Sequence, residues 1–222
     1  MKTHIFIQAR MSSARYPGKV LAPFQNKPLI KHMIDRATRV NGKDKVIVLT
    51  SRDESDNPLV AYLQQLGCLF FRGSLNNVFG RFRECVKGYP CDYFVRLSAD
   101  SPVLDPKLIE HMIDQARINN FKYDLVSNVV KRTFPRGQSV EVIKSASFLN
   151  VDEDVLTEQD REHVTPYFYR HSTQYSILSI EAEEDLSFKK MCVDTVEDLK
   201  ALEQQGEDIF SFNVNGLCPI NC

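Results

Sequence analysis

The 222-residue sequence lacks any long hydrophobic run. Near the amino terminus, the apolar stretch before Gln8 is only three residues long, Ile5–Ile7. A helix that spans a bilayer needs roughly 18 apolar residues, and a secretory signal also needs an apolar core. We therefore expect a cytoplasmic protein with no membrane contact and no signal peptide.

An excess of charge of one sign is also missing. The chain has 28 Lys and Arg against 29 Asp and Glu, which gives a net charge of −1 with His neutral. Domains that bind nucleic acid usually carry a basic excess. The balance therefore argues against nucleic acid as a partner.

Paired cysteines are absent as well. The six cysteines form no C-x-x-C pair and lie near no histidine cluster with the spacing of zinc ligands. In the expected cytosolic setting, reduced thiols are favoured over disulfides. The cysteines are Cys68, Cys85, Cys91, Cys192, Cys218 and Cys222.

The composition that is present is typical of a folded chain. Hydrophobic residues make up 43% and charged residues 26%, close to the averages of globular proteins. At about 150 residues per domain, the length suits a single domain over residues 1–222.

The first two thirds of the chain alternate between short apolar runs and amphipathic segments. Strands are expected at His4–Ala9, Lys45–Thr50, Cys68–Arg72 and Tyr93–Leu97, and helices at Pro28–Val40, Pro58–Leu66, Asn77–Lys87 and Pro106–Ile118. Repeated β-α units feed a parallel sheet. The sequence therefore predicts an α/β fold with a mostly parallel central sheet flanked by helices.

After Lys122 the pattern changes. Further strands are expected at Asp124–Asn128, Ser139–Ile143 and Gln174–Ile180, with a polar helix around Glu158–Arg170 and a last helix that opens at Thr195. We interpret residues 130–180 as an inserted arm that folds against the main sheet or against a second subunit.

A cationic loop follows directly after the first expected strand. It places Arg10, Arg15 and Lys19 at spacings of five and four residues, with Ser12, Ser13 and a Pro-Gly turn between them. In open parallel sheets, ligands bind beyond the carboxyl ends of the strands, and arginine forks, lysine and loop amides bind phosphate oxygens. With one glycine and no Ser or Thr after Lys19, this is not a Walker A loop. We favour a phosphate-binding loop over a solvated basic one.

Two carboxylates also end apolar runs. Asp100 follows the strand Tyr93–Leu97, and Asp194 follows Cys192-Val193. Mg²⁺ prefers one or two carboxylates with substrate phosphates in its remaining positions. Taken singly, Asp100 suits a turn before Pro102 and Asp194 a helix amino terminus, but together with the loop they predict a magnesium site.

Two more segments carry polar candidates. Arg132, Arg136 and Glu141 suit a pocket for a polar or anionic acceptor, and an exposed hairpin is an equal alternative. His163 is a candidate general base, although a lone histidine on a polar helix is more often structural.

Taken together, these segments resemble a known family. IQARMSSARYPGKVL, RLSADSPVLD, RTFPRG with VEV, REHVTPY and VDTVEDL occur in the order found in the spore-coat polysaccharide biosynthesis cytidylyltransferase-like family. That family is similar, more distantly, to CMP-KDO synthetase and acylneuraminate cytidylyltransferase. The resemblance implies a nucleotide-diphosphosugar-transferase-like, Rossmann-like fold, usually homodimeric, that couples CTP to an acidic or modified sugar and releases pyrophosphate.

The resemblance also implies roles for individual residues. Arg10, Ser13, Arg15 and Lys19 match the triphosphate and nucleotide loop, and Asp100 and Asp194 match the magnesium carboxylates. Arg72, Gly73 and nearby Asn77 match the segment that approaches the nucleobase. Glu141, Glu162 and His163 fall in motifs that face the sugar or the dimer contact, and Arg132 and Arg136 join them as substrate-binding candidates.

Several positions depart from the family pattern. Gly80 stands where Asp is common, Ala99 replaces Gly, Ser101 replaces Cys, and Arg136, Gln138 and Ser139 replace a D-G-L-D core. The departures concern the base and the acceptor more than the reaction. The hypothesis is Mg²⁺-dependent cytidylyl transfer to a small sugar, for surface polysaccharide or glycan precursor synthesis. The alternatives are a nucleotide-sugar-dependent glycosyltransferase, against which no D-x-D stands at the strand end, and a catalytically degraded nucleotide-binding regulator.

Overall fold

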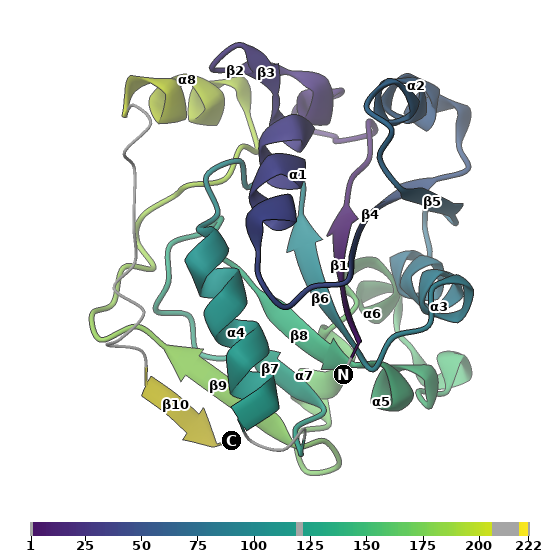
Figure 1. The fold of residues 1–222 in the computed structure, drawn as a ribbon, viewed down its shortest axis with the longest axis vertical. Coiled ribbons are helices and arrows are strands. Elements are labelled where there is room, and N and C mark those ends of the chain that lie inside the picture. The colour runs from purple at the N-terminus through teal and green to yellow at the C-terminus, as the bar shows by residue number, and fades with distance from the viewer. Residues whose placement is uncertain (1, 119–121, 206–217, 222) are drawn as a thin grey trace.

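The computed structural model describes residues 2–118, 122–205 and 218–221, which form an α/β fold around one large sheet (Figure 1). Within these residues the sheet has eight strands. Their order is β10 (Cys218–Asn221), β9 (Ile177–Glu181), β7 (Leu125–Ser127), β8 (Glu141–Lys144), β6 (Tyr93–Ser98), β1 (Thr3–Gln8), β4 (Lys45–Ser51) and β5 (Phe70–Gly73). A small antiparallel hairpin, β2 (Pro23–Phe24) and β3 (Lys27–Pro28), lies outside it.

The sheet combines a parallel half with a mixed half. β6, β1, β4 and β5 pair in parallel. β8 runs antiparallel to both of its neighbours, β6 and β7, while β7 and β9 pair in parallel and β10 is antiparallel to β9. The predicted mostly parallel central sheet is therefore confirmed.

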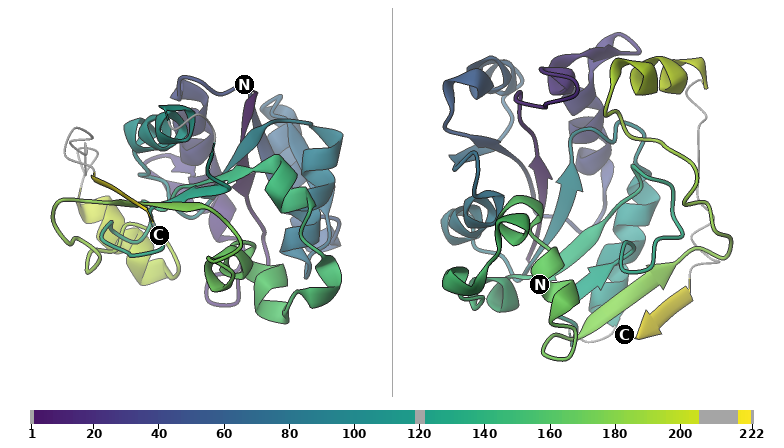
Figure 2. Two further views of the ribbon diagram at one scale, coloured as in Figure 1. Left: turned by 90° about the horizontal axis from the view of Figure 1, so that it is seen from below. Right: turned by 180° about the vertical axis from the view of Figure 1, so that it is seen from behind.

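Helices cover both faces of the sheet, and Figure 2 shows the resulting layers. In Figure 1, α1 and α4 cross the front of the sheet and α3 and α5 lie behind it. The helices are α1 (Leu29–Arg39), α2 (Asn57–Gln65), α3 (Val78–Gly88), α4 (Pro106–Ile118), α5 (Ser145–Leu149), α6 (Glu158–His163), α7 (Pro166–Arg170) and α8 (Val196–Gln204). Three short 3-10 helices, η1 (Lys19–Leu21), η2 (Glu54–Asp56) and η3 (Glu153–Val155), lie between them.

The alternation of side chains along β1 explains why both faces are covered. Ile5 and Ile7 pack with α1, α2 and α4 in one core, whereas Phe6 packs with α3, α5 and α7 in the other. Successive residues of a strand point to opposite faces, so a strand that is apolar on both faces must be buried on both.

A third, smaller cluster closes the carboxyl end of the sheet. It joins Phe24 of the hairpin and Leu29 of α1 to Met191, Val193 and α8. Figure 1 shows α8 and the hairpin together at this end of the molecule. This packing brings the chain near Asp194 next to the loops that follow β1 and β6.

The observed strands and helices match those predicted from the sequence, with a few differences. The four early strands, four early helices and later strands are confirmed to within a few residues. The expected helix around Glu158–Arg170 divides into α6 and α7, because Val164 has a φ of +73° and Pro166 starts a new helix. The sequence reading had missed the hairpin, α5 and β10.

Residues 130–180 contribute directly to the sheet. β8 and β9 belong to this segment, and α5, α6 and α7 lie between them in the chain. The segment thus continues the main fold, and its contact with a second subunit stays a prediction.

Cys68, Cys85, Cys91 and Cys192 carry free thiols. Among the residues described, no helix combines the length and the apolar character that crossing a membrane requires.

Candidate active site

The loops after β1 and β6 surround a cavity of about 360 Å³ at the carboxyl ends of these strands. Below, this is the first cavity. The predicted residues that line it come from four separate segments. They are Arg10, Ser13, Arg15, Lys19, Asp100, Glu162, His163 and Asp194.

The cationic loop is folded around a single peptide group. The carbonyl of Met11 accepts hydrogen bonds from the amides of Ser13, at 2.9 Å, and Gly18, at 2.8 Å. The chain then enters η1, which begins at Lys19. Arg15 lies inside this closed loop, and Arg10 and Lys19 lie directly beside it, so one backbone arrangement presents all three cations to the cavity.

Lys19 joins the two predicted metal carboxylates. Its Nζ lies 2.9 Å from Asp100 Oδ2 and 3.4 Å from Asp194 Oδ1, and it donates to the Val193 carbonyl at 2.7 Å. The Lys19 side chain is 10% exposed, and those of Asp100 and Asp194 are 24% and 21% exposed. Residues 19, 100 and 194, far apart in sequence, therefore form one half-buried charge cluster.

Two further cations face Asp194. Arg15 Nη2 lies 3.0 Å from Asp194 Oδ1, and Lys190 Nζ lies 3.2 Å from Oδ2. Burial disfavours the carboxylate, but the Lys190 hydrogen bond and the charges of Lys19, Lys190 and Arg15 outweigh it and lower the pKa of Asp194. Asp194 is therefore ionised at neutral pH and available as a cation ligand.

The donor set suits Mg²⁺ better than a structural metal. Among the described residues, no group of three or more His, Cys, Asp or Glu side chains forms a metal cage. Mg²⁺ is commonly held by one or two carboxylates, with phosphates and water completing its octahedron. Asp100 and Asp194, both in contact with one ammonium group, fit that arrangement.

α6 also contributes to the lining of the first cavity. Glu162 Oε1 lies 3.4 Å from Arg10 Nη2, and both side chains are exposed. His163 also lines the cavity. An exposed ion pair contributes little to stability, so this contact leaves Arg10 free to turn towards a ligand.

A second cavity of about 440 Å³ adjoins the first and shares Gln8, Ser98 and Asp100 with it. The predicted acceptor residues Arg132, Arg136 and Glu141 line this second cavity. Arg132 donates to the Ser139 hydroxyl at 3.1 Å. Gly137, with a φ of +102°, lies so close to the next segment that a Cβ would stand 2.5 Å from the Met191 carbonyl. The turn that carries Arg136 therefore depends on glycine.

Glu141 is engaged in a network of its own. It pairs with Arg96 at 2.5 Å and accepts a hydrogen bond from Tyr169, whose hydroxyl also contacts Ser127. Burial and the nearby Glu141 charge raise the pKa of Tyr169 well above its usual value. Glu141 thus fixes Arg96 at the wall of the second cavity.

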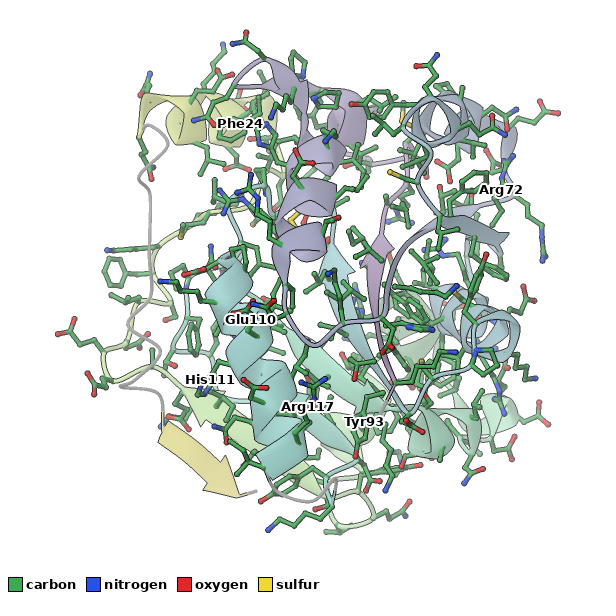
Figure 3. The ribbon with its side chains drawn as sticks, viewed as in Figure 1. Phe24, Arg72, Tyr93, Glu110, His111 and Arg117 are labelled. Atoms are coloured by element: carbon green, nitrogen blue, oxygen red, sulfur yellow. The ribbon has the colours of Figure 1, made fainter. Side chains whose placement is uncertain are left out.

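The three residues predicted near the nucleobase line neither cavity. Arg72 lies on the edge strand β5 (Figure 3) and donates to the carbonyls of Ser51 and Asp53. Asn77 caps α3 by accepting from the Gly80 amide. At Gly73, a Cβ would come within 2.7 Å of the Arg81 side chain, so this glycine lets α3 approach the sheet.

Arg81 and Arg96 are lining residues that the sequence reading had missed. Arg81 lines the first cavity and is only 2% exposed, and its Nε has no hydrogen-bond partner among the described residues. Burial lowers the pKa of Arg81 to about 10, although the charge of Asp56 opposes this effect. A signal did exist for both residues: each is an arginine on an otherwise apolar face, with Val78 and Phe82 on α3 and with Phe94 on β6.

The family model described as "Cytidylyltransferase" matches residues 4–210. The spore coat polysaccharide biosynthesis protein SpsF of Bacillus subtilis is 31% identical over 209 residues, which cover 90% of this chain and 85% of that protein.

Solved structures agree with this similarity. A cytidylyltransferase from Leptospira borgpetersenii superimposes with a TM-score of 0.87 at 31% identity, covering 91% of this chain and 85% of that one. CMP:2-keto-3-deoxy-manno-octonic acid synthetase, solved in complex with CTP, has a TM-score of 0.69 at 18% identity and covers 92% and 98% of the two chains. The second comparison extends the likeness in fold to a more distant protein.

Proposed function

The chain belongs to the cytidylyltransferase family, and on that premise we propose that it transfers CMP from CTP to an acidic or modified sugar and releases pyrophosphate. The product would supply the synthesis of a surface polysaccharide or glycan. The name of the Bacillus subtilis relative supports this role. The observation that carries the proposal is the adjoining pair of cationic cavities, which meet at Asp100.

The first cavity suits the triphosphate of CTP. Arg10, Arg15 and Lys19 bring three positive charges to one wall, and arginine and lysine groups bind phosphate oxygens through charge-assisted hydrogen bonds. Arg15 and Lys19 are paired with carboxylates in the structure. These ion pairs orient Arg15 and Lys19 towards the cavity before the phosphates of CTP bind to them.

The second cavity suits an anionic acceptor. Arg96 is neutralised by Glu141, whereas Arg132 donates to a neutral hydroxyl and Arg136 also lines the cavity, with no carboxylate paired to either among the described residues. Their charges favour an acceptor that carries a carboxylate or a phosphate. This is our reason for proposing an acidic sugar.

The reaction needs in-line attack at the α-phosphate. An acceptor hydroxyl in the second cavity attacks the α-phosphorus of CTP through its oxygen and gives up its proton to water. The bond between the α-phosphorus and the bridging oxygen breaks, and pyrophosphate leaves with both electrons of that bond. Arg10, Arg15 and Lys19 offset the charge that develops on the leaving group. Asp100 and Asp194 would hold Mg²⁺, which neutralises phosphate charge and aligns the phosphates when bound.

Product analysis tests the proposal. The enzyme is incubated with CTP, Mg²⁺ and a panel of acidic sugars, and the expected products are pyrophosphate and a CMP-sugar identified by mass. A nucleoside diphosphate formed from a nucleotide sugar would instead indicate glycosyl transfer. CTP binding without turnover across the panel would indicate a nucleotide-binding regulator. Thermal stability with CTP, UTP, GTP and ATP, each with and without Mg²⁺, identifies the preferred base.

A further inference from the structure

Asp56 is a fully buried carboxylate at the end of η2, next to the start of α2. Its Oδ2 accepts hydrogen bonds from the Thr50 hydroxyl and the Ser51 amide, both at 2.9 Å, and from the Ser51 hydroxyl. Its Oδ1 accepts from the amide of Met11 at 2.7 Å. Two of these four donors are backbone N–H groups, one on each carboxylate oxygen, and an N–H group can only donate, so both oxygens must act as acceptors.

Met11 is the residue around whose backbone the cationic loop is folded. Its carbonyl accepts from Ser13 and Gly18, while its amide donates to Asp56. The loop therefore closes on Met11, and Met11 is tied to the end of β4 through Asp56. Arg10 precedes this point in the chain, and Lys19 follows Gly18 directly.

A buried cation balances the charge of Asp56. Arg81 interacts with Asp56 through space and lines the first cavity, with its Nε unpartnered. Opposite charges in a poorly solvated region stabilise each other at distances beyond a direct contact. Asp56 is therefore linked to the first cavity by its hydrogen bond to the loop, and its charge also acts on Arg81, which lines that cavity.

We propose that Asp56 is a positioning residue for the nucleotide: its carboxylate accepts the Met11 amide hydrogen bond and so holds Arg10, Arg15 and Lys19 in the arrangement that receives the triphosphate. Asp56 itself does not line either cavity. The inference rests on the proposed function and adds to it a residue that acts through the loop.

The test compares Asp56 with Asp124. Both carboxylates accept hydrogen bonds from a backbone amide and a hydroxyl, but they lie at opposite ends of the sheet. Asp124 accepts the Ser176 amide at 2.9 Å and the Ser147 hydroxyl near the amino-terminal end of β7. Asp56→Asn and Asp124→Asn both replace an acceptor oxygen by a donor. CTP affinity is measured by calorimetry well below the melting temperature of each variant, and melting temperatures are recorded alongside.

We expect both variants to melt at a lower temperature than the wild type, but only Asp56→Asn to bind CTP more weakly. Its Kd for CTP rises about tenfold or more, and kcat/KM falls on the order of a hundredfold, because small misplacements of binding groups cost rate steeply. The Asp124→Asn enzyme keeps the wild-type Kd. Equal Kd values in wild type and Asp56→Asn would overturn the proposal and leave Asp56 a structural residue.

Amide hydrogen exchange gives a readout that needs no ligand. In the wild type, the amides of Met11, Ser13 and Gly18 are expected to be protected; in Asp56→Asn this protection is lost while that of β1 and β6 remains. If the Met11 amide of the wild type exchanges as rapidly as an unfolded chain, the proposal is wrong, even if Asp56→Asn fails to fold. Failure of the proposed function shows differently, as a wild-type enzyme that binds no CTP although these amides are protected.

Discussion

Replacing Lys19 by methionine probes the centre of the charge cluster. Methionine keeps most of the volume and removes the ammonium group that contacts Asp100, Asp194 and the Val193 carbonyl. The two carboxylates then lose the cation that they share, and the triphosphate loses one of its partners. We expect a loss of both stability and nucleotide binding.

The stability change can be bounded from the contacts. Removing one partner of a buried ion pair costs about 3–5 kcal/mol, but Asp100 and Asp194 are partly exposed, and Arg15 and Lys190 remain beside Asp194. We therefore expect a loss of about 2 kcal/mol, because only part of the pair is desolvated. For a chain of this size that lowers the melting temperature by about 4–8 °C.

The change in binding and catalysis is expected to be larger. Loss of one charge that stabilises the departing group lowers turnover on the order of a hundredfold or more. Calorimetry with CTP measures the affinity without an acceptor. Mg²⁺ alone should stabilise Lys19→Met more than the wild type, because the metal then meets two carboxylates that have lost their shared ammonium.

Lys31→Met provides the matched control. Lys31 pairs with Asp35 on α1 and lines neither cavity, so its loss should leave the Kd for CTP unchanged. A Lys19→Met enzyme with wild-type affinity for CTP and wild-type turnover would refute the assignment of Lys19 to the triphosphate. An equal loss of CTP affinity in Lys19→Met and Lys31→Met would refute the inference that Lys19 matters because it lines the first cavity.

Three further predictions follow from other contacts. Burial opposes ionisation of Asp160, but hydrogen bonds from Arg170 and Thr157 lower its pKa to about 2. This stabilisation is present above the unfolded pKa and is lost as pH falls, so between about pH 5 and about pH 2 the wild type should lose about 2 kcal/mol more unfolding free energy than Asp160→Asn, measured by urea titration. Gly137→Ala should destabilise the chain by about 1–3 kcal/mol in the same assay, because its φ of +102° and the Met191 carbonyl leave no room for a Cβ. Arg136→Gln should raise the KM for an acidic acceptor on the order of tenfold or more while the Kd for CTP stays unchanged, because a hydrogen bond to a charged group is lost.

Each of these expectations has an outcome that contradicts it. Parallel pH curves for the wild type and Asp160→Asn would mean that Arg170 does not hold the carboxylate in solution. A Gly137→Ala protein of wild-type stability would mean that the Met191 segment moves freely. A higher Kd for CTP in Arg136→Gln would place that side chain at the nucleotide and not at the acceptor.

The main fold and most of the polar lining of the first cavity could be predicted from the order of residues alone. The alternation of apolar runs and amphipathic segments specified the early β-α units. Because parallel strands end at one edge of a sheet, residues that follow different strands must meet there. Arg10, Arg15, Lys19 and Asp100 were predictable for that reason, and the structure brings Asp194 to the same group.

Which polar residues are buried, and which groups they bind, depends on contacts between distant segments of the folded chain. Asp56 lies in the polar run Asp53-Glu54-Ser55-Asp56, which reads as an exposed turn, yet it is fully buried because the chain brings Met11, Thr50 and Ser51 around it. Likewise, Arg72 binds backbone carbonyls, and Glu141 is committed to Arg96 and Tyr169.

The physical reason is the range of the interactions. Periodicity records which face of an element is apolar, and that information is local. The cost of burying a charge depends on the donors and counter-charges that distant segments provide. Such partners come together only after the chain has folded. The sequence therefore indicates where the site lies. The folded structure determines which of its polar residues face the cavities and which hold other residues in place.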